Sequence, residues 1–541
     1  MEIGVTSDIP TYSGGLGVLA GDSVRSCADL RILLVAVTLV SRRGYLKQQI
    51  TKWGDQIEYL DDWEPSKFMR LLPDTVTVRI DGRDVKIKSW LYDLQSPTGG
   101  LVPIFFLDTD ILENDPKDRE ITNSLYGGDE RYRLKQEMVL GIGGVRMLNA
   151  LKFKINKYHM NEGHSGLLTL EMLKKNDMNA DRTRDLCIFT THTPVEAAFD
   201  KFSYDDAHTI LGEEFPLEEL KKYAGKDKLN MTLLALNLSK YVNGVTKAHM
   251  EYSKSLFPGY HLRAITNGVH PYTWTCQPFR ELFDAYIPGW ANEPELLVRV
   301  DEIPYQKIWD AHIKAKILLI NYINKGIDTE MGTNVLTLGF ARRAAAYKRA
   351  TFFFSDLDRL RDINKRGSLQ IVFAGKAHPR DEAGKRIIKE IYNYRSLLQG
   401  DINVVYLENY NMELAGRLTS GVDIWLNTPL PPNEASGTSG MKAAYNGVIN
   451  LSVLDGWWIE GCIEGVTGWA IGPKPNELIG EGERRVRELK DLYNKLEYLI
   501  VPMFYNNRDA WTNMMRNSIG KIAYYFHSHR MMRRYATEAY L

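Results

Sequence analysis

The chain has 541 residues, of which 44% are hydrophobic and 25% are charged, and 68 lysines and arginines balance 68 aspartates and glutamates. Because this length exceeds one ordinary core, we expect two large domains, and the balanced charge argues against a nucleic-acid surface and leaves only local anion pockets. The four cysteines form no CxxC pair, no apolar stretch could span a bilayer and the start resembles no secretion signal, so we expect a reduced, cytoplasmic protein without a membrane partner.

Apolar, β-rich runs alternate with helical patterns along the whole chain. The clearest runs cover residues 186–190, 335–340, 369–374 and 404–407. Short runs separated by helices are typical of parallel sheets covered on both faces, which predicts an α/β protein. Glycines and prolines interrupt the pattern between residues 267 and 292. We therefore predict two Rossmann-like, doubly wound domains at residues 1–270 and 271–515, facing a central cleft that binds ligands, and a helical tail at 516–541 that could pack back on the first domain.

The first motif is the glycine-rich segment at residues 13–21, which follows a short strand candidate and leads into a helical pattern at 22–30. Glycines let backbone N–H groups approach an anion closely, and the start of a helix favours negative charge. A tight turn between a strand and a helix would use the same residues.

Three polar segments follow at the ends of strand candidates. His159 and His164 flank a glutamate, but the helical zinc spacing HExxH is absent and no third ligand is evident, so we expect no metal and prefer sugar hydroxyl contacts or structural hydrogen bonds. The segments at residues 191–194 and 265–270 are polar loops. Each could hold sugar hydroxyls or form turns.

A basic cluster at residues 342–349 directly follows the strand candidate at 335–340. Four cations at the carboxyl end of a strand suit a phosphate, because arginine forks and a lysine point charge both bind it. A solvated basic face of a helix would look the same.

The segment at residues 433–442 reads NEASGTSGMK, and Lys442 lies about one turn into the helix that it opens. Small, hydroxyl-bearing and glycine residues can cradle an anion. A lysine beside such a phosphate site can form a Schiff base with pyridoxal phosphate, because a cationic, desolvated setting lowers its pKa. A surface lysine after a flexible loop is the alternative.

Taken together, the identity and order of these motifs resemble the glycogen, starch and maltodextrin phosphorylase family, in its compact bacterial and archaeal form. The motifs that carry the resemblance are MEIG, GGLG, LY…RLKQE, NEGH, HTP, ITNG, RRxxxYKR, GKA, LENY and EASGTSGMK, and they cover roughly residues 1 to 460. The resemblance implies a fold of the GT-B glycosyltransferase type.

The resemblance also implies roles for individual residues. Lys442 would bind pyridoxal 5'-phosphate covalently, and the cofactor would contact Arg342, Tyr410, Thr438 and Ser439. The substrate phosphate would be held by Gly15, Arg343 and Lys348. The terminal glucose would be held by Leu16, Glu162, His164, His192, Asn267, Glu434, Ala435, Ser436 and Gly437. The catalytic set would be Lys442, Arg343, Lys348 and His192.

The chain departs from the family pattern at a few positions. Arg342 stands where the long enzymes have lysine, which keeps the charge but changes the donor geometry. Ala344–Ala346 replaces a stretch that holds a histidine and an acid in the vertebrate branch, Ser439 stands where glycine is common, and Glu162 stands where aspartate is common. These departures bear on gating contacts and phosphate geometry.

The implied reaction is the reversible phosphorolysis of terminal α-1,4-linked glucose, releasing α-glucose 1-phosphate with retention. No carboxylate pair of the glycosidase kind is evident, and cations around two phosphates fit the phosphorolytic route. The alternatives are a nucleotide-sugar-dependent glucan synthase, which gives no reason for Lys442, an aminotransferase, and a catalytically silent glucan-binding protein. We expect no control by nucleotides or by N-terminal phosphorylation, because the start of the chain aligns with the start of the family's core, and homo-oligomer formation is left open.

Overall fold

The computed structural model describes residues 1–196, 199–326 and 330–541. They form two compact units. The first unit comprises Met1–Leu46, Leu60–Thr266 and Met531–Leu541, and the second comprises Lys47–Tyr59 and Asn267–Arg530. Each unit therefore contains a segment that the sequence order alone would assign to the other. In the part of the chain just delimited, no helix combines the length and the apolar character needed to cross a membrane.

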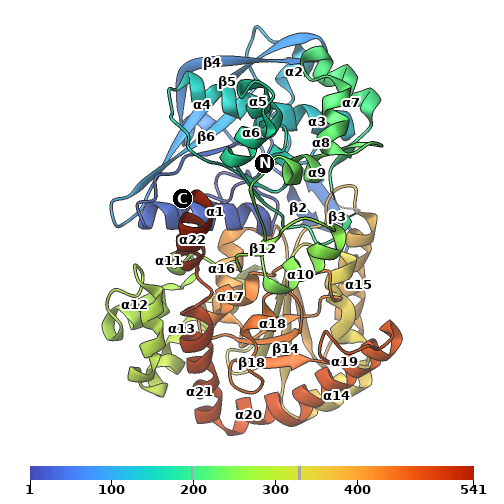
Figure 1. Ribbon diagram of the computed structural model, residues 1–541. Coiled ribbons are helices and arrows are strands. Elements are labelled where there is room, and N and C mark those ends of the chain that lie inside the picture. Colours follow the sequence, from blue (N-terminus) through green and yellow to red (C-terminus); the bar gives the residue numbers. More distant parts are fainter. Residues whose placement is uncertain (197–198, 327–329) are drawn as a thin grey trace. The chain divides into compact units, whose positions relative to one another are not determined.

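A six-stranded parallel sheet forms the centre of the second unit (Figure 1). Its strands are β13 (Leu336–Ala341), β14 (Leu369–Ala374), β15 (Asn403–Leu407), β16 (Ile424–Asn427), β17 (Ile449–Val453) and β18 (Gly468–Ile471). Their order in space is β15-β14-β13-β16-β17-β18, which is the doubly wound order with a switch point between β13 and β16. Every residue of β13 and β14 is buried, so the continuous apolar runs in the sequence predicted these strands correctly.

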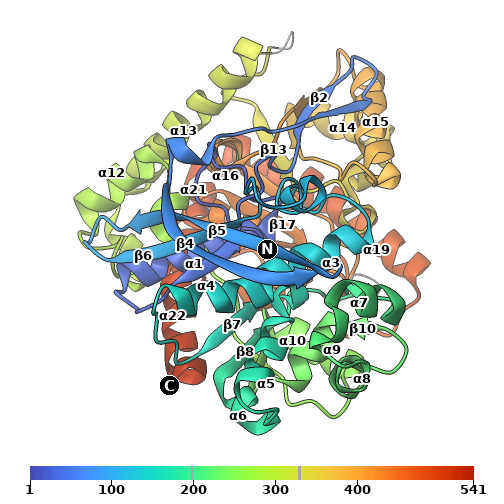
Figure 2. The same cartoon turned by 90° about the horizontal axis from the view of Figure 1, so that it is seen from above.

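Helices cover this sheet, and Figure 2 shows the long helix α13 (Tyr305–Gly326) from above. The others are α11 (Pro271–Trp274), α12 (Gln277–Tyr286), α14 (Leu357–Arg366), α15 (Glu382–Leu397), α16 (Met412–Gly421), α17 (Ser439–Ala444), α18 (Trp458–Gly461), α19 (Glu481–Lys495), α20 (Val501–Asn506) and α21 (Arg508–Ser518). Apolar residues of α13, α16 and α17 build a core with the sheet, in which Trp425, Leu418 and Val372 are fully buried. Helix α22 (Ser528–Tyr535) carries the chain into the last segment of the first unit.

The hairpin of β2 (Lys47–Ile50) and β3 (Gln56–Tyr59) belongs to the second unit although it comes early in the chain. It lies beside α15 in both views (Figures 1 and 2). Ion pairs join Asp55 to Lys389 at 2.7 Å and Glu58 to Lys385 at 3.1 Å. Periodicity cannot predict this placement, because a two-stranded hairpin does not specify its packing partner.

The first unit contains two four-stranded sheets rather than one. The parallel sheet has the order β12-β11-β8-β7, with β7 (Tyr158–Asn161), β8 (Cys187–Thr190), β11 (Tyr241–Gly244) and β12 (Arg263–Ala264). The other has the order β1-β6-β5-β4, with β1 (Ala36–Leu39), β4 (Arg70–Ile80), β5 (Arg83–Gln95) and β6 (Leu101–Asp108). Strand β5 runs antiparallel to both neighbours. The tight turn at Asp81 and Gly82, both with positive φ, reverses the chain between β4 and β5.

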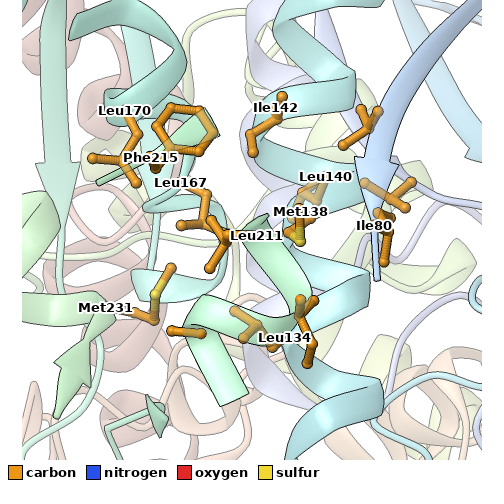
Figure 3. Packing of buried hydrophobic residues seen from close by; sticks show 14 of the residues in the cluster. Ile80, Leu134, Met138, Leu140, Ile142, Leu167, Leu170, Leu211, Phe215 and Met231 are labelled. Atoms are coloured by element: carbon orange, nitrogen blue, oxygen red, sulfur yellow. The ribbon is translucent and has the colours of Figure 1, made fainter. Parts of the chain in front are cut away.

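The short antiparallel strands β9 (Lys201–Phe202) and β10 (Leu229–Asn230) complete the strands of this unit. Its helices are α1 (Gly15–Asp29), α2 (Pro116–Arg119), α3 (Glu130–Met138), α4 (Gly144–Ala150), α5 (Leu168–Lys175), α6 (Ala180–Leu186), α7 (Tyr204–Leu211), α8 (Leu217–Ala224), α9 (Met231–Asn237) and α10 (Lys247–Leu256). Figure 3 shows the main core, where Leu134 and Met138 of α3 pack with Leu211 and Met231. The α/β class expected from the sequence is therefore present in both units.

The start of α1 differs from the expectation. The sequence placed the helix at residues 22–30 after a strand, but α1 begins at Gly15, and the segment before it is not a strand. Glycine has low helix propensity, which concealed the first turns. Gly17 and Gly21 are needed for packing, since a Cβ would lie 2.7 Å from Glu2 Oε2 and 2.0 Å from the Gly4 carbonyl oxygen, respectively.

Candidate functional site

The carboxyl ends of the parallel strands in the second unit carry most of the predicted site residues. Arg342 directly follows β13, Tyr410 follows β15, and the loop at residues 428–438 joins β16 to α17. Because these strands are parallel and adjacent, their following loops emerge at one edge of the sheet, at the switch point where doubly wound folds bind ligands.

Arg342, Lys348 and Glu434 form a buried charged cluster at this edge. Arg342 Nη2 lies 2.7 Å from Glu434 Oε2, and Lys348 Nζ donates to the same oxygen. Each of the three side chains is only 10% exposed. Sequence reasoning assigned these residues to three different ligands, whereas the structure joins them in one ion-pair network.

The charges in this cluster are unequally stabilised. Burial, reinforced by the positive charge of Arg342, lowers the pKa of Lys348 to about 7, although Glu434 acts in the opposite direction. Burial disfavours the ionised form of Glu434, but the two cations outweigh it and lower its pKa to about 2. One carboxylate therefore faces two cations, which leaves an excess of positive charge, and Lys348 is held close to its point of deprotonation near neutral pH.

Arg342 retains unused hydrogen-bonding capacity. Its Nε and Nη1 atoms are buried and have no hydrogen-bond partner among the described residues. Buried donors of a guanidinium rarely stay unpaired, so they indicate a place where an anion fits. Arg343 is exposed, and with Arg342 and Lys348 it lines a small cavity whose remaining wall includes Phe340, Phe373 and Tyr406.

Lys442 lies within α17 as predicted and is only 7% exposed. Its Nζ atom is 3.7 Å from the ring centroid of Trp274, and Ser439 Oγ accepts a hydrogen bond from Trp425 Nε1 at 3.0 Å. Trp274 and Trp425 were not predicted, because nothing local in the sequence separates them from core tryptophans. Thr438 precedes the helix, and Tyr410 follows Asn409, whose φ is 54°.

Asp455 positions the loop that contains Glu434, and sequence reasoning missed it. Its carboxylate accepts hydrogen bonds from the backbone N–H groups of Glu434 and Gly456, both at 2.9 Å. The N–H of Trp457 donates to the carbonyl oxygen of Ser436 at 2.9 Å. Burial and the nearby charge of Glu434 raise the pKa of Asp455 to about 7, against the effect of its backbone hydrogen bonds. The one local sequence feature that could have pointed to Asp455 was the aspartate-glycine pair that follows β17.

Two predicted sugar-binding residues of this unit present buried polar atoms. Asn267 Oδ1 and Ser436 Oγ have no hydrogen-bond partner within residues 1–196, 199–326 and 330–541. Ala435 and Gly437 lie in the same loop as Ser436, and Gly437 needs its φ of 80°. Unpaired buried acceptors and hydroxyls are compatible with a hydroxyl-rich ligand.

The β2–β3 hairpin holds two loops of this edge with glutamine side chains. Gln48 Nε2 donates to the Gly375 carbonyl oxygen at 2.8 Å, and Gln48 Oε1 accepts from the N–H of Asn409 at 3.0 Å. Gln56 bonds both the N–H and the carbonyl of Ala377, at 3.0 and 2.9 Å. The loops after β14 and β15 are therefore fixed by residues more than three hundred positions earlier.

In the first unit, the glycine-rich loop is held by Glu2. Its Oε2 atom accepts from the N–H of Ser13 at 2.5 Å and from Ser13 Oγ at 3.2 Å. A Cβ added to Gly14 or Gly15 would meet no atom within 4 Å, so the backbone at the start of α1 is accessible. Leu16 follows in the first turn and is partly buried. This geometry is compatible with an anion at the start of a long helix.

The other predicted residues of the first unit form a polar cluster. Glu162 Oε2 accepts from the N–H of His192 and from Thr193 Oγ1, both at 2.8 Å, and His192 Nε2 lies 2.6 Å from Asn161 Oδ1. His164 Nε2 is 3.5 Å from Asp200 Oδ2. Glu162, His164 and His192 were predicted as sugar contacts. The structure shows that Glu162 uses its carboxylate on the backbone and side chain of residues 192 and 193.

Comparisons with known proteins agree with this site chemistry. A family model described as carbohydrate phosphorylase matches residues 202–499. Maltodextrin phosphorylase of Thermococcus litoralis is 40% identical over all of this chain and 70% of its own length. Glycogen phosphorylase of Aquifex aeolicus is 33% identical over all of this chain and 85% of its own, and that of Mycobacterium tuberculosis is 33% identical over all of this chain and 70% of its own. The chain therefore belongs to the carbohydrate phosphorylase family.

Proposed function

We propose that this chain is an α-glucan phosphorylase that transfers the terminal α-1,4-linked glucose of a glucan to inorganic phosphate and releases α-glucose 1-phosphate with retention. The relatives named maltodextrin and glycogen phosphorylase support this activity. The observation that carries it is the cluster in which two buried cations share one oxygen of Glu434. A site with excess positive charge suits an anionic co-substrate.

The residues around Lys442 fit pyridoxal 5'-phosphate. Lys442 provides a buried amine for the covalent link, and Arg342 provides two buried donors for the cofactor phosphate. Thr438 and Ser439 add hydroxyls, and Tyr410 would pack near the ring. When bound, the cofactor supplies a phosphate group that exchanges a proton with the substrate phosphate.

Arg343, Lys348 and the backbone at Gly15 hold the substrate phosphate. A dianion beside Lys348 favours the protonated lysine, so binding raises its pKa from about 7. Arg343 adds a forked donor. Together the cations neutralise a phosphate that would otherwise repel a second phosphate nearby.

The glucosyl unit is held by Leu16, His164, His192, Asn267, Glu434, Ala435, Ser436 and Gly437. Buried polar atoms on His164, Asn267 and Ser436 have no hydrogen-bond partner in the described part of the chain, and sugar hydroxyls can pair with them. Glu162 stays in the proposal as a residue that holds the peptide of His192. A pocket of this kind discriminates against sugars that lack a hydroxyl.

The domain assignment belongs to the same proposal. Residues 1–270 would form the glucan side and residues 271–515 the cofactor-binding domain of a GT-B enzyme. The doubly wound strand order of β13–β18 supports the second assignment. The proposed partners are an α-1,4-glucan and phosphate or glucose 1-phosphate.

The test is product analysis with purified protein. Maltodextrin plus inorganic phosphate should yield glucose 1-phosphate, and omission of phosphate should abolish glucosyl release. Release of free glucose without phosphate, or a requirement for a nucleotide sugar, would refute the proposal. Glucan binding without turnover in either direction would favour the silent binding protein.

A further inference from the structure

His192 is held by two consecutive residues at the end of the neighbouring strand β7. Asn161 is the last residue of β7 and pairs in register with Thr190, the last residue of β8. Glu162 follows with a φ of 75° and accepts hydrogen bonds from the N–H of His192 and from Thr193 Oγ1. A positive φ at a glutamate costs free energy, and such strain is concentrated at functional sites.

The ring of His192 is oriented by Asn161. His192 Nε2 lies 2.6 Å from Asn161 Oδ1. An amide oxygen can only accept a hydrogen bond, so Nε2 must carry the proton. In the neutral ring Nδ1 is then an acceptor, and among the described residues the side-chain hydrogen bond of His192 is the one from Nε2 to Asn161.

The surroundings keep this ring neutral. Burial lowers the pKa of His192 to about 3, and the nearby His249 and His159 contribute smaller effects in the same direction. Burial also lowers the pKa of both His159 and His249 to about 4, so none of the three is cationic near neutral pH. Glu162 is the acidic group in contact with this histidine, and its carboxylate already accepts from the N–H of Gly163 as well as from residues 192 and 193.

We propose that Asn161 is a positioning residue that fixes His192 as the Nε2–H tautomer, so that Nδ1 accepts a hydrogen bond from a donating hydroxyl of the glucosyl unit. The sugar contact rests on the function proposed above, whereas the tautomer does not. The consequence is a specificity rule: at this point the enzyme recognises a group that donates a hydrogen bond and disfavours one that can only accept.

The tautomer is tested without turnover. Histidine labelled with ¹⁵N in the whole chain, with the His192 signals assigned by their loss in His192→Gln, should show a protonated Nε2 and an unprotonated Nδ1 near neutral pH. Asn161→Leu should produce a tautomer mixture, whereas Asn149→Leu, on the exposed face of α4, should change nothing. A protonated Nδ1 in the unmodified protein, or an unchanged tautomer in Asn161→Leu, would overturn the proposal.

Kinetics test the sugar contact. Asn161→Leu should lower kcat/KM for the glucan roughly tenfold and change kcat/KM for phosphate much less, since one hydrogen bond to the sugar is weakened. Asn161→Asp keeps the acceptor but adds a charge that raises the pKa of His192, so activity should match the unmodified enzyme at high pH and fall as pH decreases and Nδ1 is protonated.

Two kinetic results would contradict the proposal. Equal losses toward glucan and phosphate in Asn161→Leu would indicate a general structural role, and an unaltered pH profile in Asn161→Asp would show that Nδ1 accepts nothing during turnover. Thermal unfolding of each variant checks the fold, and Asn161→Asp stays informative if the leucine variant fails to fold. If the tautomer is confirmed while His192→Gln leaves glucan kinetics unchanged, the sugar contact fails but phosphorolysis itself stands.

Discussion

The second unit holds Arg342, Lys348 and Glu434 as a buried, ion-paired cluster, whereas in the first unit burial leaves His159 and His192 uncharged. The difference lies in the partners. Glu434 faces two cations that more than offset its desolvation, while each histidine faces amides, hydroxyls or other histidines that give no charge compensation. Burial of ionisable groups thus leaves an ion-paired cluster in one unit, where we propose that phosphate binds, and uncharged histidines in the other, where we propose that sugar hydroxyls bind.

This contrast has a chemical consequence. Arg342 and Lys348 carry one more positive charge than Glu434 offsets, so the edge of β13–β18 favours an added anion such as phosphate. His192 is uncharged, so it can pair with a neutral hydroxyl without the desolvation of a charge. Variants that alter charge should therefore have their largest effect at Arg342, Lys348 and Glu434. Variants that alter hydrogen-bond direction should have their largest effect around His192.

The largest effect is expected at Lys442. Lys442→Ala should lose the covalent cofactor and reduce activity by a factor on the order of a thousand, because proton exchange with the substrate phosphate would be lost. The near-ultraviolet absorbance of the bound cofactor should disappear. Borohydride should fix the cofactor to the peptide that holds Lys442 in the unmodified protein only. Lys490→Ala, at an exposed position of α19, is the control. A colourless protein with full activity would refute this assignment.

The next effect is expected at Arg343. Arg343→Ala should lower kcat/KM for phosphate roughly tenfold, since a charge-assisted contact is lost at a partly solvated position. The KM for glucan should stay nearly constant, which separates the two regions. Initial rates at varied phosphate and varied glucan measure both, with Arg417→Ala on the surface of α16 as the control. Equal losses for both substrates would show that Arg343 does not act on phosphate in particular.

A change in pH dependence is expected for Glu434→Gln. The negative charge of Glu434 raises the pKa of Lys348, so its removal should lower that pKa below about 7. The protonated lysine would then be lost at a lower pH, and the alkaline limb of the activity profile should move toward acid. Turnover should also decrease severalfold, since a sugar contact is lost. Glu413→Gln, at an exposed position, should leave the profile unchanged, and an unmoved limb in Glu434→Gln would exclude Lys348 as its origin.

The smallest effect is expected in the hairpin. Gln48→Ala removes hydrogen bonds to Gly375 and Asn409 and should destabilise the second unit by about 1 to 3 kcal/mol, because a buried carbonyl and a backbone N–H lose partners. Activity should fall only a few-fold. Gln49→Ala, one residue further along and exposed, is the matched control. Denaturant unfolding and cofactor retention measure the change, and equal stability of the two variants would show that the hairpin does not hold the loops.

The sequence predicted three strands of the second unit well, since β14 coincides with residues 369–374, β13 is displaced by one residue and β15 begins one residue earlier. It also placed Lys442 correctly inside a helix. It failed at the start of α1, where glycines hide the helix, and it did not predict the antiparallel hairpin β4–β5 in the first unit. Continuous apolar runs determine buried parallel strands, but alternating polar strands depend on which face the neighbouring elements cover.

The sequence by itself determined the family, the order of the motifs and the residue that we assign to the cofactor, because these depend on short segments whose chemistry is local. Only the tertiary structure decided that Glu434 joins Arg342 and Lys348 across 92 and 86 residues. It likewise decided that Gln48 fixes a loop 361 residues away and that Asn161 orients His192. Such contacts are set by strand order and by the packing of loops at the sheet edge, which neither periodicity nor composition encodes.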